Sequence, residues 1–370
     1  VIMSLNNRMA PRVTINLSSI RSNYKLLESK LSNSVLASVL KGNAYGLGIE
    51  RVALTLSKAG CNIFFVATLD EGIELRQILP KATIYIFHGF FSESYGDYRK
   101  SKLKPILNSI EQIRDWLPYS DIMAGVQFDT GMLRLGLKPK DIENLKDKEK
   151  KNIELLMSHL ACADDKNDKK NLKQLKNFNN AIISFKAKYN SLAASSGIFL
   201  GRNYHHNLCR TGAALFGINP TPYEPNHMQS SISLQTGILQ IRQVNNRETV
   251  GYGGTYQVSR ATKIATIAIG YADGFSRSLG NKGSVFINQY KAPIIGRISM
   301  DLTTIDVTDV PDQFLYSGNC VDLIGPNYDL DEIAKDAGTI GYEILTSLGS
   351  RVKRHYIDNE EKNIRLFKDR

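Results

Sequence analysis

The feature of this sequence that most constrains its fold is a repeated alternation of short apolar runs and amphipathic windows between residues 35 and 212. The apolar runs have the length and β-branched content of strands, and the windows repeat their apolar residues at helical spacing. Such alternation favours parallel strands, because a crossover helix returns the chain to the same end of the sheet. Eight strands in about 200 residues suit a closed (β/α)8 barrel of the TIM type better than an open sheet. The predicted strands are 35–40, 63–67, 83–87, 104–107, 122–128, 153–159, 191–194 and 208–212, with helices at 19–31, 49–59, 70–79, 109–117, 140–145 and 168–189.

Beyond residue 218 the pattern changes. A proline-rich connection at 219–225 leads into short strand-like runs separated by glycines, which are typical of antiparallel β structure. We therefore predict an α/β chain with a barrel domain over residues 1–228, of which residues 1–10 are free to pack with the second domain. The second domain, over residues 229–370, is predicted to be mostly antiparallel. Its predicted strands are 234–243, 263–269, 284–287, 292–295, 302–307 and 321–325, and its helices are 331–337 and 341–347.

Lys41 occupies a chemically unusual place in this pattern. It follows the first predicted barrel strand and precedes a loop with three glycines and a tyrosine. Partial withdrawal of an ammonium from water favours the neutral amine, which is a nucleophile that can form a Schiff base. A lysine at a strand end can also simply extend its charge into solvent. The position alone therefore leaves a catalytic and a structural role open.

The charge of the chain does not point to nucleic acid. The formal net charge is +11, but the excess lies in lysine- and asparagine-rich runs at 138–151 and 166–176 without interleaved aromatic residues. Runs of this kind are typical of solvated helix faces. We therefore predict no nucleic-acid partner.

The cysteines and the first residues indicate a compartment. The four cysteines are scattered, with no C-x-x-C pair and no histidine grouping nearby, so we expect reduced thiols and no metal site. Residues 1–12 contain no apolar block of signal-peptide length, and no window has the length of a membrane span. These patterns predict a cytoplasmic protein without a membrane segment.

The segment around Lys41 reads Lys41-Gly42-Asn43-Ala44-Tyr45-Gly46-Leu47-Gly48. It resembles the pyridoxal-phosphate lysine motif of alanine racemases, usually written K-A-N-A-Y-G-H-G. A barrel followed by a β domain is also the layout of that family, so the resemblance covers most of the chain. It implies a pyridoxal 5'-phosphate enzyme that interconverts L- and D-alanine and supplies D-alanine for cell-wall peptidoglycan.

Further segments carry the same resemblance. They are similar to the family patterns V-D-T-G-M-x-R-x-G, V-R-P-G-I-A-L-Y-G, S-Y-G-x-T-Y, G-Y-A-D-G and G-R-V-C-M-D. In this chain they read Phe128-Asp129-Thr130-Gly131-Met132-Leu133-Arg134-Leu135-Gly136, Cys209-Arg210-Thr211-Gly212-Ala213-Ala214-Leu215-Phe216-Gly217, Gly251-Tyr252-Gly253-Gly254-Thr255-Tyr256, Gly270-Tyr271-Ala272-Asp273-Gly274 and Gly296-Arg297-Ile298-Ser299-Met300-Asp301. Shorter matches are Ser158-His159-Leu160-Ala161, Ala193-Ala194-Ser195-Ser196-Gly197 and Gly341-Tyr342-Glu343.

The resemblance implies two catalytic bases, Lys41 on one face of the substrate and Tyr252 on the other. Inversion at Cα needs a proton acceptor on one face and a donor on the opposite face. The resemblance also implies a head-to-tail homodimer in which the β domain of one copy completes the active site of its partner. The implied cofactor-binding residues are Lys41, Tyr45, Arg134, His159, Ser195, Arg210, Gly212, Ala213 and Tyr342. The implied substrate-binding residues are Arg134, Met300 and Tyr271.

Arg210 bears on the type of reaction. The resemblance places it against the pyridine nitrogen, where many other pyridoxal enzymes have a carboxylate that keeps the ring protonated as an electron sink. An arginine, with a pKa above ~12, does not surrender its proton there. The carbanion is then poorly delocalised and short-lived, which favours racemisation over transamination or decarboxylation.

The chain departs from the family pattern in places. Many members have a carbamylated lysine where this chain has Gln127, so we expect the neutral amide, or a bound anion, to hold Arg134. Ala194 replaces the usual asparagine beside Ser195, which removes a polar contact, and Ser299 replaces a cysteine. What these changes do to the reaction is left open.

Other functions remain compatible with the pattern. The nearest alternative is a racemase of the same fold with another or broader specificity, for example for serine or lysine. A non-catalytic pyridoxal-phosphate-binding protein would usually be a lone barrel, and a pyridoxal decarboxylase would want a carboxylate in place of Arg210. Fold alone does not separate these, so the site residues have to.

Overall fold

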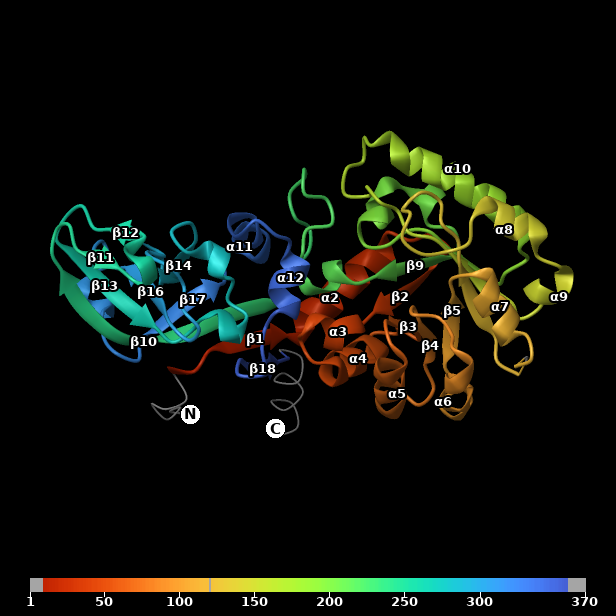
Figure 1. Cartoon of the computed structure of the whole chain (residues 1–370), viewed down its shortest axis with the longest axis horizontal. Helices are drawn as coiled ribbons and strands as arrows, with labels where there is room; N and C mark the ends of the chain where they lie inside the picture. The colour runs from red at the N-terminus through yellow and green to blue at the C-terminus, as the bar shows by residue number, and fades with distance from the viewer. Residues whose placement is uncertain (1–8, 120, 359–370) are drawn as a thin grey trace, which may run out of the picture. The chain divides into compact units, whose positions relative to one another are not determined.

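The computed structural model describes residues 9–119 and 121–358. Within them the chain divides into two compact units (Figure 1). Residues 19–229 form one, which we call the barrel unit. Residues 9–18 and 230–358 belong to the other, which we call the β unit. The division therefore falls at residue 18 as well as at residue 229, because the first described strand joins the later part of the chain.

The barrel unit contains eight parallel strands in the order β8-β7-β6-β5-β4-β3-β2-β9. The predicted (β/α)8 barrel is confirmed. Seven predicted strands differ from the observed ones only at their ends, but the one predicted at 191–194 was misplaced, because the observed strand is Tyr189–Ser191. The barrel is nearly closed: β8 and β9 share no ladder, but Arg210 N donates to Ala193 O (3.0 Å) just beyond the end of β8. The strands are β2 (Val35–Val39), β3 (Ile63–Val66), β4 (Thr83–Ile86), β5 (Lys104–Leu107), β6 (Ala124–Gln127), β7 (Ile153–Met157), β8 (Tyr189–Ser191) and β9 (Leu208–Thr211).

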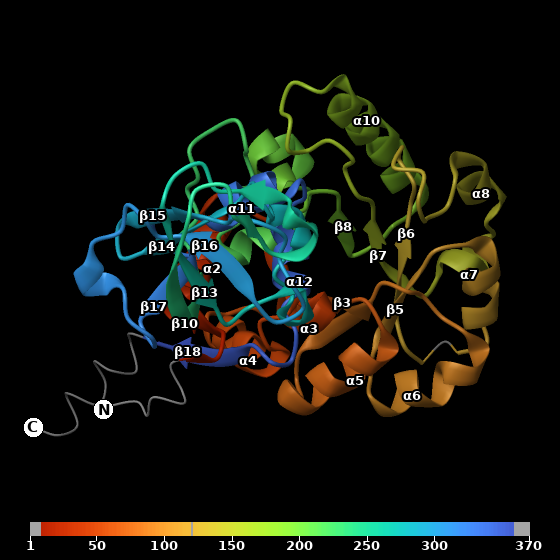
Figure 2. The same cartoon turned by 60° about the vertical axis from the view of Figure 1, so that its left-hand side comes forward.

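Helices pack outside these strands (Figure 2). The first one begins at Leu17, two residues earlier than predicted, because the Asn16 side chain caps it by accepting the Ser18 N–H at 3.1 Å. Two short helices, α6 (Tyr95–Lys100) and α9 (Asp147–Lys150), were not predicted. The helices are α2 (Leu17–Ser29), α4 (Ile49–Lys58), α5 (Leu69–Ile78), α6 (Tyr95–Lys100), α7 (Ile110–Trp116), α8 (Pro139–Asn144), α9 (Asp147–Lys150) and α10 (Lys169–Ser184).

An apolar core fills the barrel, as the near-continuous hydrophobic strands require. The Phe65 ring stacks on Tyr85 and Phe87, with ring centroids 4.9 Å and 5.3 Å apart. These rings lead from the core toward the carboxyl end of β4. The core residues are Ala37, Val39, Ile63, Phe65, Tyr85, Ile106, Leu155, Met157 and Leu208.

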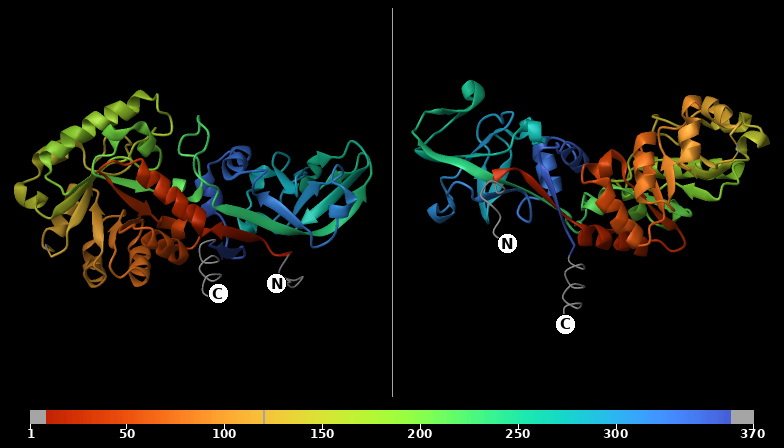
Figure 3. Two further views of the ribbon diagram at one scale, coloured as in Figure 1. Left: turned by 180° about the vertical axis from the view of Figure 1, so that it is seen from behind. Right: turned by 90° about the horizontal axis from the view of Figure 1, so that it is seen from below.

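The β unit is built on β10 (Ile232–Val244). Its first half pairs with β1 (Arg12–Asn16) and β17 (Cys320–Ile324), and its second half pairs with β13 (Thr262–Ile267). An irregularity between Ile238 and Gln240 separates its ladder with β13 into two registers. The pairs are antiparallel except that β1 runs parallel to β18 (Lys353–Ile357), so the mostly antiparallel prediction is confirmed. Figure 3 shows β1 beside the long β10. The other elements of the sheets are β11 (Thr249–Val250), β12 (Tyr256–Gln257), β13 (Thr262–Ile267), β14 (Ser284–Ile287), β15 (Tyr290–Pro293), β16 (Thr303–Asp306) and β17 (Cys320–Ile324), and the helices are α11 (Leu330–Ala337) and α12 (Gly341–Thr346).

Two further observations concern the cysteines and the length of the helices. All four cysteines lie in the described part of the chain and are free thiols. Over residues 9–119 and 121–358, no helix combines the length and the apolar character needed to cross a membrane.

Candidate active site

Lys41 begins a left-handed turn directly after β2. Residues 42 to 46 all have positive φ, from 52° at Ala44 to 81° at Gly46. An L-residue in this conformation is disfavoured by about 1–2 kcal/mol, so Asn43, Ala44 and Tyr45 carry strain that their surroundings must offset. The three glycines of this loop, Gly42, Gly46 and Gly48, also have positive φ, which glycine adopts without a steric penalty.

Hydrogen bonds hold this turn from inside and outside. Gly46 N donates to Gly42 O at 2.7 Å, and the Asn43 side chain accepts the N–H of Ile49 at the start of α4, also at 2.7 Å. From outside, Gly42 N donates to Oε1 of Glu71 at 2.6 Å. The backbone beside Lys41 is therefore fixed although the segment is a loop.

The Lys41 amine lies 5.9 Å from the centroid of the Phe87 ring, at the carboxyl end of β4. Lys41 is exposed by its surface area, yet the protein around the amine displaces enough water to lower its pKa. Arg134 lowers this pKa further, and Glu71 opposes the shift. The amine therefore becomes neutral, and nucleophilic, at a lower pH than an ordinary lysine.

His159 follows β7 and lies near the same cations. Burial lowers the pKa of its imidazole to about 3, and the charges of Arg210, Arg134 and Lys41 act in the same direction. The ring is therefore neutral at physiological pH. These three cations, with Glu71 as the opposing charge on Lys41, leave a positive field at the carboxyl end of the strands, where barrels carry their chemistry. Such a field suits an anionic ligand.

Arg210 lies in β9 and is only 2% exposed. Its guanidinium donates to the carbonyl and hydroxyl of Ser191, at 2.9 Å for the carbonyl, and to Ser158 O at 2.6 Å. Burial lowers its pKa to about 10, so Arg210 is still protonated at neutral pH. The guanidinium thus ties together the ends of β7, β8 and β9. These guanidinium bonds go to the two serines, whereas His159 is linked to Arg210 through the electrostatic effect on the pKa of its imidazole.

The loop between β6 and α8 carries Arg134. The Asp129 carboxylate accepts the N–H groups of residues 131–133 at 2.9 to 3.1 Å and so folds the loop back on itself. Gln127 Nε2 donates to Leu135 O at 3.0 Å. The neutral amide therefore fixes the backbone next to Arg134, at the position where many family members have a carbamylated lysine.

Gln174 on α10 belongs to this site and was missed by the sequence analysis. It is fully buried; its Nε2 donates to Thr130 Oγ1 and His159 O, and its Oε1 accepts Ala161 N, all at 2.9 Å. It therefore joins the Arg134 loop to the end of β7. The available signal was a glutamine one helical turn before Phe178, on the apolar face of a lysine-rich helix.

A second group of predicted residues gathers where β8 and β9 end. Ser195 Oγ accepts the N–H groups of Gly212 and Ala214 at 3.1 and 3.5 Å, and Ala213 begins the short η4 helix between them (Ala213–Phe216). A Cβ on residue 212 would lie 2.3 Å from Tyr45 Oη, so only glycine leaves this space open. A hydroxyl beside successive backbone N–H groups is a typical donor set for phosphate.

In the β unit, Tyr252 stands at the start of a glycine turn. Gly251, Gly253 and Gly254 all have positive φ, and Gly254 N donates to Gly251 O at 3.2 Å. The Tyr252 side chain is 71% exposed. The turn therefore presents the phenol without using it for packing.

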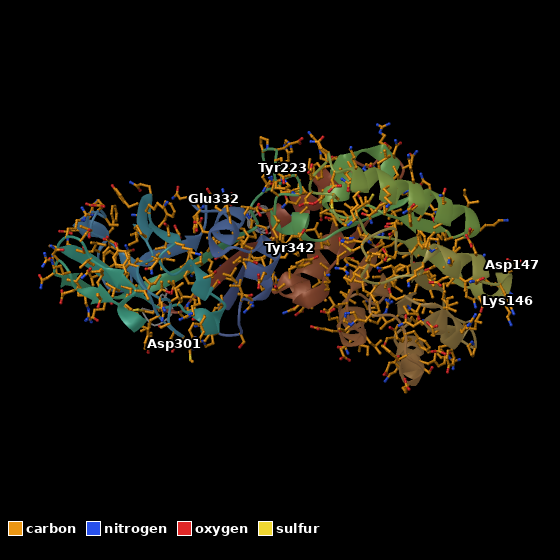
Figure 4. The ribbon with its side chains drawn as sticks, turned by 45° about the horizontal axis from the view of Figure 1, so that its top comes forward. Lys146, Asp147, Tyr223, Asp301, Glu332 and Tyr342 are labelled. Atoms are coloured by element: carbon orange, nitrogen blue, oxygen red, sulfur yellow. The ribbon has the colours of Figure 1, made fainter. Side chains whose placement is uncertain are left out.

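Tyr271 and Met300 are carried by two turns bonded to each other. Tyr271 N donates to Ser299 O at 3.1 Å, and Ser299 Oγ bonds to the backbone of Leu302 to close its own turn. Arg351 bridges the turns, donating to Asp273 at 2.9 Å and to Asp301 at 2.8 Å. Met300 and Tyr271 themselves are 53% and 44% exposed. Tyr342 lies on α12, at the helical end of the β unit (Figure 4).

The predicted site residues are thus divided between the two units. The barrel unit gathers eight of them at the carboxyl end of its strands: Lys41, Tyr45, Arg134, His159, Ser195, Arg210, Gly212 and Ala213. The β unit carries Tyr252, Tyr271, Met300 and Tyr342.

Comparison with known proteins agrees with this division. Residues 15–220 match the family model of the alanine racemase N-terminal domain, and residues 231–356 match that of the alanine racemase C-terminal domain. The chain belongs to the alanine racemase family.

Individual relatives match over nearly the whole length. A protein of Agrobacterium fabrum named "Alanine racemase, catabolic" is 42% identical over 355 residues, which cover 93% of this chain and 92% of that protein. An alanine racemase of Rickettsia bellii is 42% identical over 339 residues, covering 89% of this chain and 83% of that protein. The crystal structure of alanine racemase from Bartonella henselae, with covalently bound pyridoxal phosphate, superposes with a TM-score of 0.91 at 37% identity, covering 94% of this chain and 99% of that one.

Proposed function

We propose that this chain is a pyridoxal 5'-phosphate-dependent alanine racemase that interconverts L- and D-alanine. The observation that carries the proposal is the gathering of Lys41, with its lowered pKa, and two arginines around the neutral His159, in a member of the alanine racemase family. The relatives named above support alanine as the substrate.

The residues present fit a phosphorylated aldehyde. An amine with a lowered pKa is suited to an aldehyde, and the positive field around His159 suits an anion. The space at Gly212 is bounded by Tyr45 and Ser195 and lined by hydroxyl and backbone groups, and a Cβ on residue 212 would collide with the Tyr45 hydroxyl. We infer that the phosphate binds to Tyr45, Ser195, Gly212 and Ala213.

Pyridoxal phosphate, when bound, supplies an aldehyde carbon for the amine and a ring that withdraws electrons from the α-carbon of the substrate. The residues of the chain then handle the protons. Lys41 Nζ takes or returns the α-proton on one face, and Tyr252 Oη serves the opposite face. Arg210 keeps its proton at neutral pH, because its pKa is about 10. Arg134 offers a planar pair of donors to the substrate carboxylate.

We further propose that two copies form a head-to-tail homodimer with shared active sites, in which Tyr252, Tyr271 and Met300 of one copy complete the barrel of its partner. The exposure of these side chains supports the proposal, and so does the location of Lys41 and Tyr252 in different units. The homodimers of Lys41→Ala and of Tyr252→Phe should each be nearly inactive. After mixing and refolding, about a quarter of wild-type activity should return, because half the dimers are mixed and each has one intact site. No recovery would rule out shared sites.

The reaction and its substrate are tested by proton exchange in heavy water with L-alanine, serine, lysine and other amino acids. Exchange at Cα with inversion, strongest on alanine, is the expected result. Equal activity on serine or lysine would replace alanine with a broader specificity. Release of carbon dioxide would instead establish a decarboxylase, and no exchange on any amino acid would contradict the racemase.

The role in the cell follows the same proposal. We expect the enzyme to act in the cytoplasm and to supply D-alanine for peptidoglycan. Expression in a bacterial strain that requires D-alanine should restore growth without it. Growth on D-alanine as the carbon source, without rescue of the requirement, would point to a catabolic role, as the name of the Agrobacterium protein indicates for that protein.

A further inference from the structure

Glu71 links the lysine turn to the neighbouring strand, although no sequence motif singled it out. It lies in the first turn of α5, directly after β3. Its Oε1 accepts Gly42 N at 2.6 Å, and its Oε2 accepts Ala67 N at 2.7 Å and Thr68 N at 3.2 Å. One carboxylate therefore holds backbone groups at the ends of both β2 and β3.

The start of α5 accounts for only part of this arrangement. Thr68 and Glu71 form a capping box, which requires the bond from the Glu71 carboxylate to Thr68 N and the return bond from Glu71 N to Thr68 Oγ1. The bond to Thr68 N is the longest of the three that the carboxylate accepts. The shortest one goes to Gly42, in a different element.

The bonded N–H has a direct relation to Lys41. The N–H of Gly42 and the C=O of Lys41 belong to one planar peptide unit. Fixing this unit at the start of a strained left-handed turn limits rotation about the bonds that orient the Lys41 side chain. The bond to Glu71 anchors this peptide to another element of the fold, whereas the hydrogen bonds within the turn do not.

We propose that Glu71 is a positioning residue for Lys41. By holding the Lys41–Gly42 peptide against the ends of β3 and α5, it keeps the amine in place beside Phe87. This inference rests on the proposed function, in which Lys41 carries the cofactor and moves a proton.

The charges around Lys41 supply a readout that a purely structural role would not change. Arg134 faces the amine from the loop after β6, Glu71 faces it from α5, and Lys41 in turn acts on His159 at the end of β7. Glu71 raises the pKa of Lys41 against the other effects. Removing its charge therefore shifts the titration of Lys41 to lower pH.

Two variants separate charge from reach. Glu71→Gln keeps the length but removes the charge and places an amide donor against backbone donors. Glu71→Asp keeps the charge but is one methylene shorter, so it cannot serve both Gly42 and Ala67. The matched control is Glu74→Gln, because Glu74 is exposed on the same helix.

The pKa of Lys41 is measured in the full chain, freed of cofactor, by pH-dependent labelling with acetic anhydride and peptide mass spectrometry. Exposed Lys58 serves as the internal reference. We expect Glu71→Gln to move labelling of Lys41, but not of Lys58, to lower pH, and Glu71→Asp to leave it close to wild type. In the holoenzyme both variants should lower kcat about ten- to a hundredfold, with KM for alanine changed by less than about threefold. Glu74→Gln should match the wild type throughout.

Wild-type labelling and wild-type kcat in Glu71→Gln would overturn the proposal. So would a loss of activity matched by an equal loss of folded protein, with labelling of Lys41 and Lys58 changed alike. If the wild-type chain does not racemise alanine, the proposed function fails, but the labelling shift still tests the contact between Glu71 and the lysine turn.

Discussion

The barrel unit and the β unit hold their site residues in different ways. In the barrel unit, Arg210, Ser195 and Gln174 are buried, and each makes several hydrogen bonds that join neighbouring strand ends or loops. In the β unit, Tyr252 and Met300 are exposed, and hydrogen bonds hold the backbone turns that carry them.

This difference separates folding from function. A buried side chain that joins strands contributes to stability and chemistry together, so its removal harms both. An exposed side chain on an independently bonded turn can be changed with little effect on folding. The following experiments test this contrast.

Tyr252→Phe should produce the largest effect, and only on activity. Loss of one of the two proton-transfer groups is expected to lower kcat about 10²- to 10⁴-fold. Its free energy of unfolding should change by less than about 0.5 kcal/mol, because the ring is mostly exposed. Racemisation kinetics and urea unfolding measure the two quantities. Tyr256→Phe, in the adjoining β12, should keep full activity; the same loss there would contradict a specific role for Tyr252.

Arg210→Ala should harm both properties. It leaves the acceptors of Ser158 and Ser191 without their donor and opens a cavity between strand ends, so we expect a loss of about 3–5 kcal/mol in the free energy of unfolding. Urea unfolding of the variant and of Arg202→Ala, an exposed arginine of the same unit, provides the comparison. Equal stability of the two variants would contradict the joining role of Arg210.

His159 should make the stability of the barrel unit depend on pH. Its folded pKa of about 3 lies below the ordinary value of 6.5, so between these values the unfolded chain binds a proton that the folded chain does not. The contribution of His159 to the free energy of unfolding is complete above about pH 6.5. Below that pH it falls by up to about 1.4 kcal/mol per pH unit.

Urea unfolding at pH 7, 6 and 5 measures this dependence. The slope against pH should be smaller in His159→Gln and unchanged in His227→Gln, whose histidine is exposed. An unchanged slope in His159→Gln would show that His159 titrates normally in the folded protein.

Arg351→Met should have the smallest effect, on substrate affinity. It removes the bridge between the turns that carry Tyr271 and Met300. We expect KM for alanine to rise several-fold while kcat changes less, because the turns keep their backbone bonds. Steady-state kinetics should show no such rise for Arg260→Met, which removes an exposed ion pair of the same unit. A fall in kcat alone would argue against a role in substrate binding.

The barrel and the lysine turn could be predicted because their signals are local. The apolar runs and helical windows indicate the strands and helices in order. The glycines around Lys41 indicate a turn with positive φ, a conformation that glycine adopts readily. Short motifs likewise predicted that Ser195, Gly212 and Tyr45 belong to one group, and in the structure Tyr45 does border the space at Gly212.

What the sequence did not reveal depends on contacts between distant residues. The parallel pairing of β1 with β18 joins segments about as far apart as this chain allows, and neither strand has a strong pattern of its own. Glu71 and Gln174 look like ordinary helix residues until their partners are known. The four-residue α9 carries too few turns to give a periodic signal.

The missing ladder between β8 and β9 has a consequence for the lifetime of the protein. Ser195 and Gly212 follow these two strands and are bonded to each other, so a phosphate group bound there would connect the strand ends and shift the folding equilibrium toward the native state by mass action. We expect cells starved of vitamin B6 to degrade the empty chain faster than the loaded one. The abundance of the protein would then report the supply of its own cofactor.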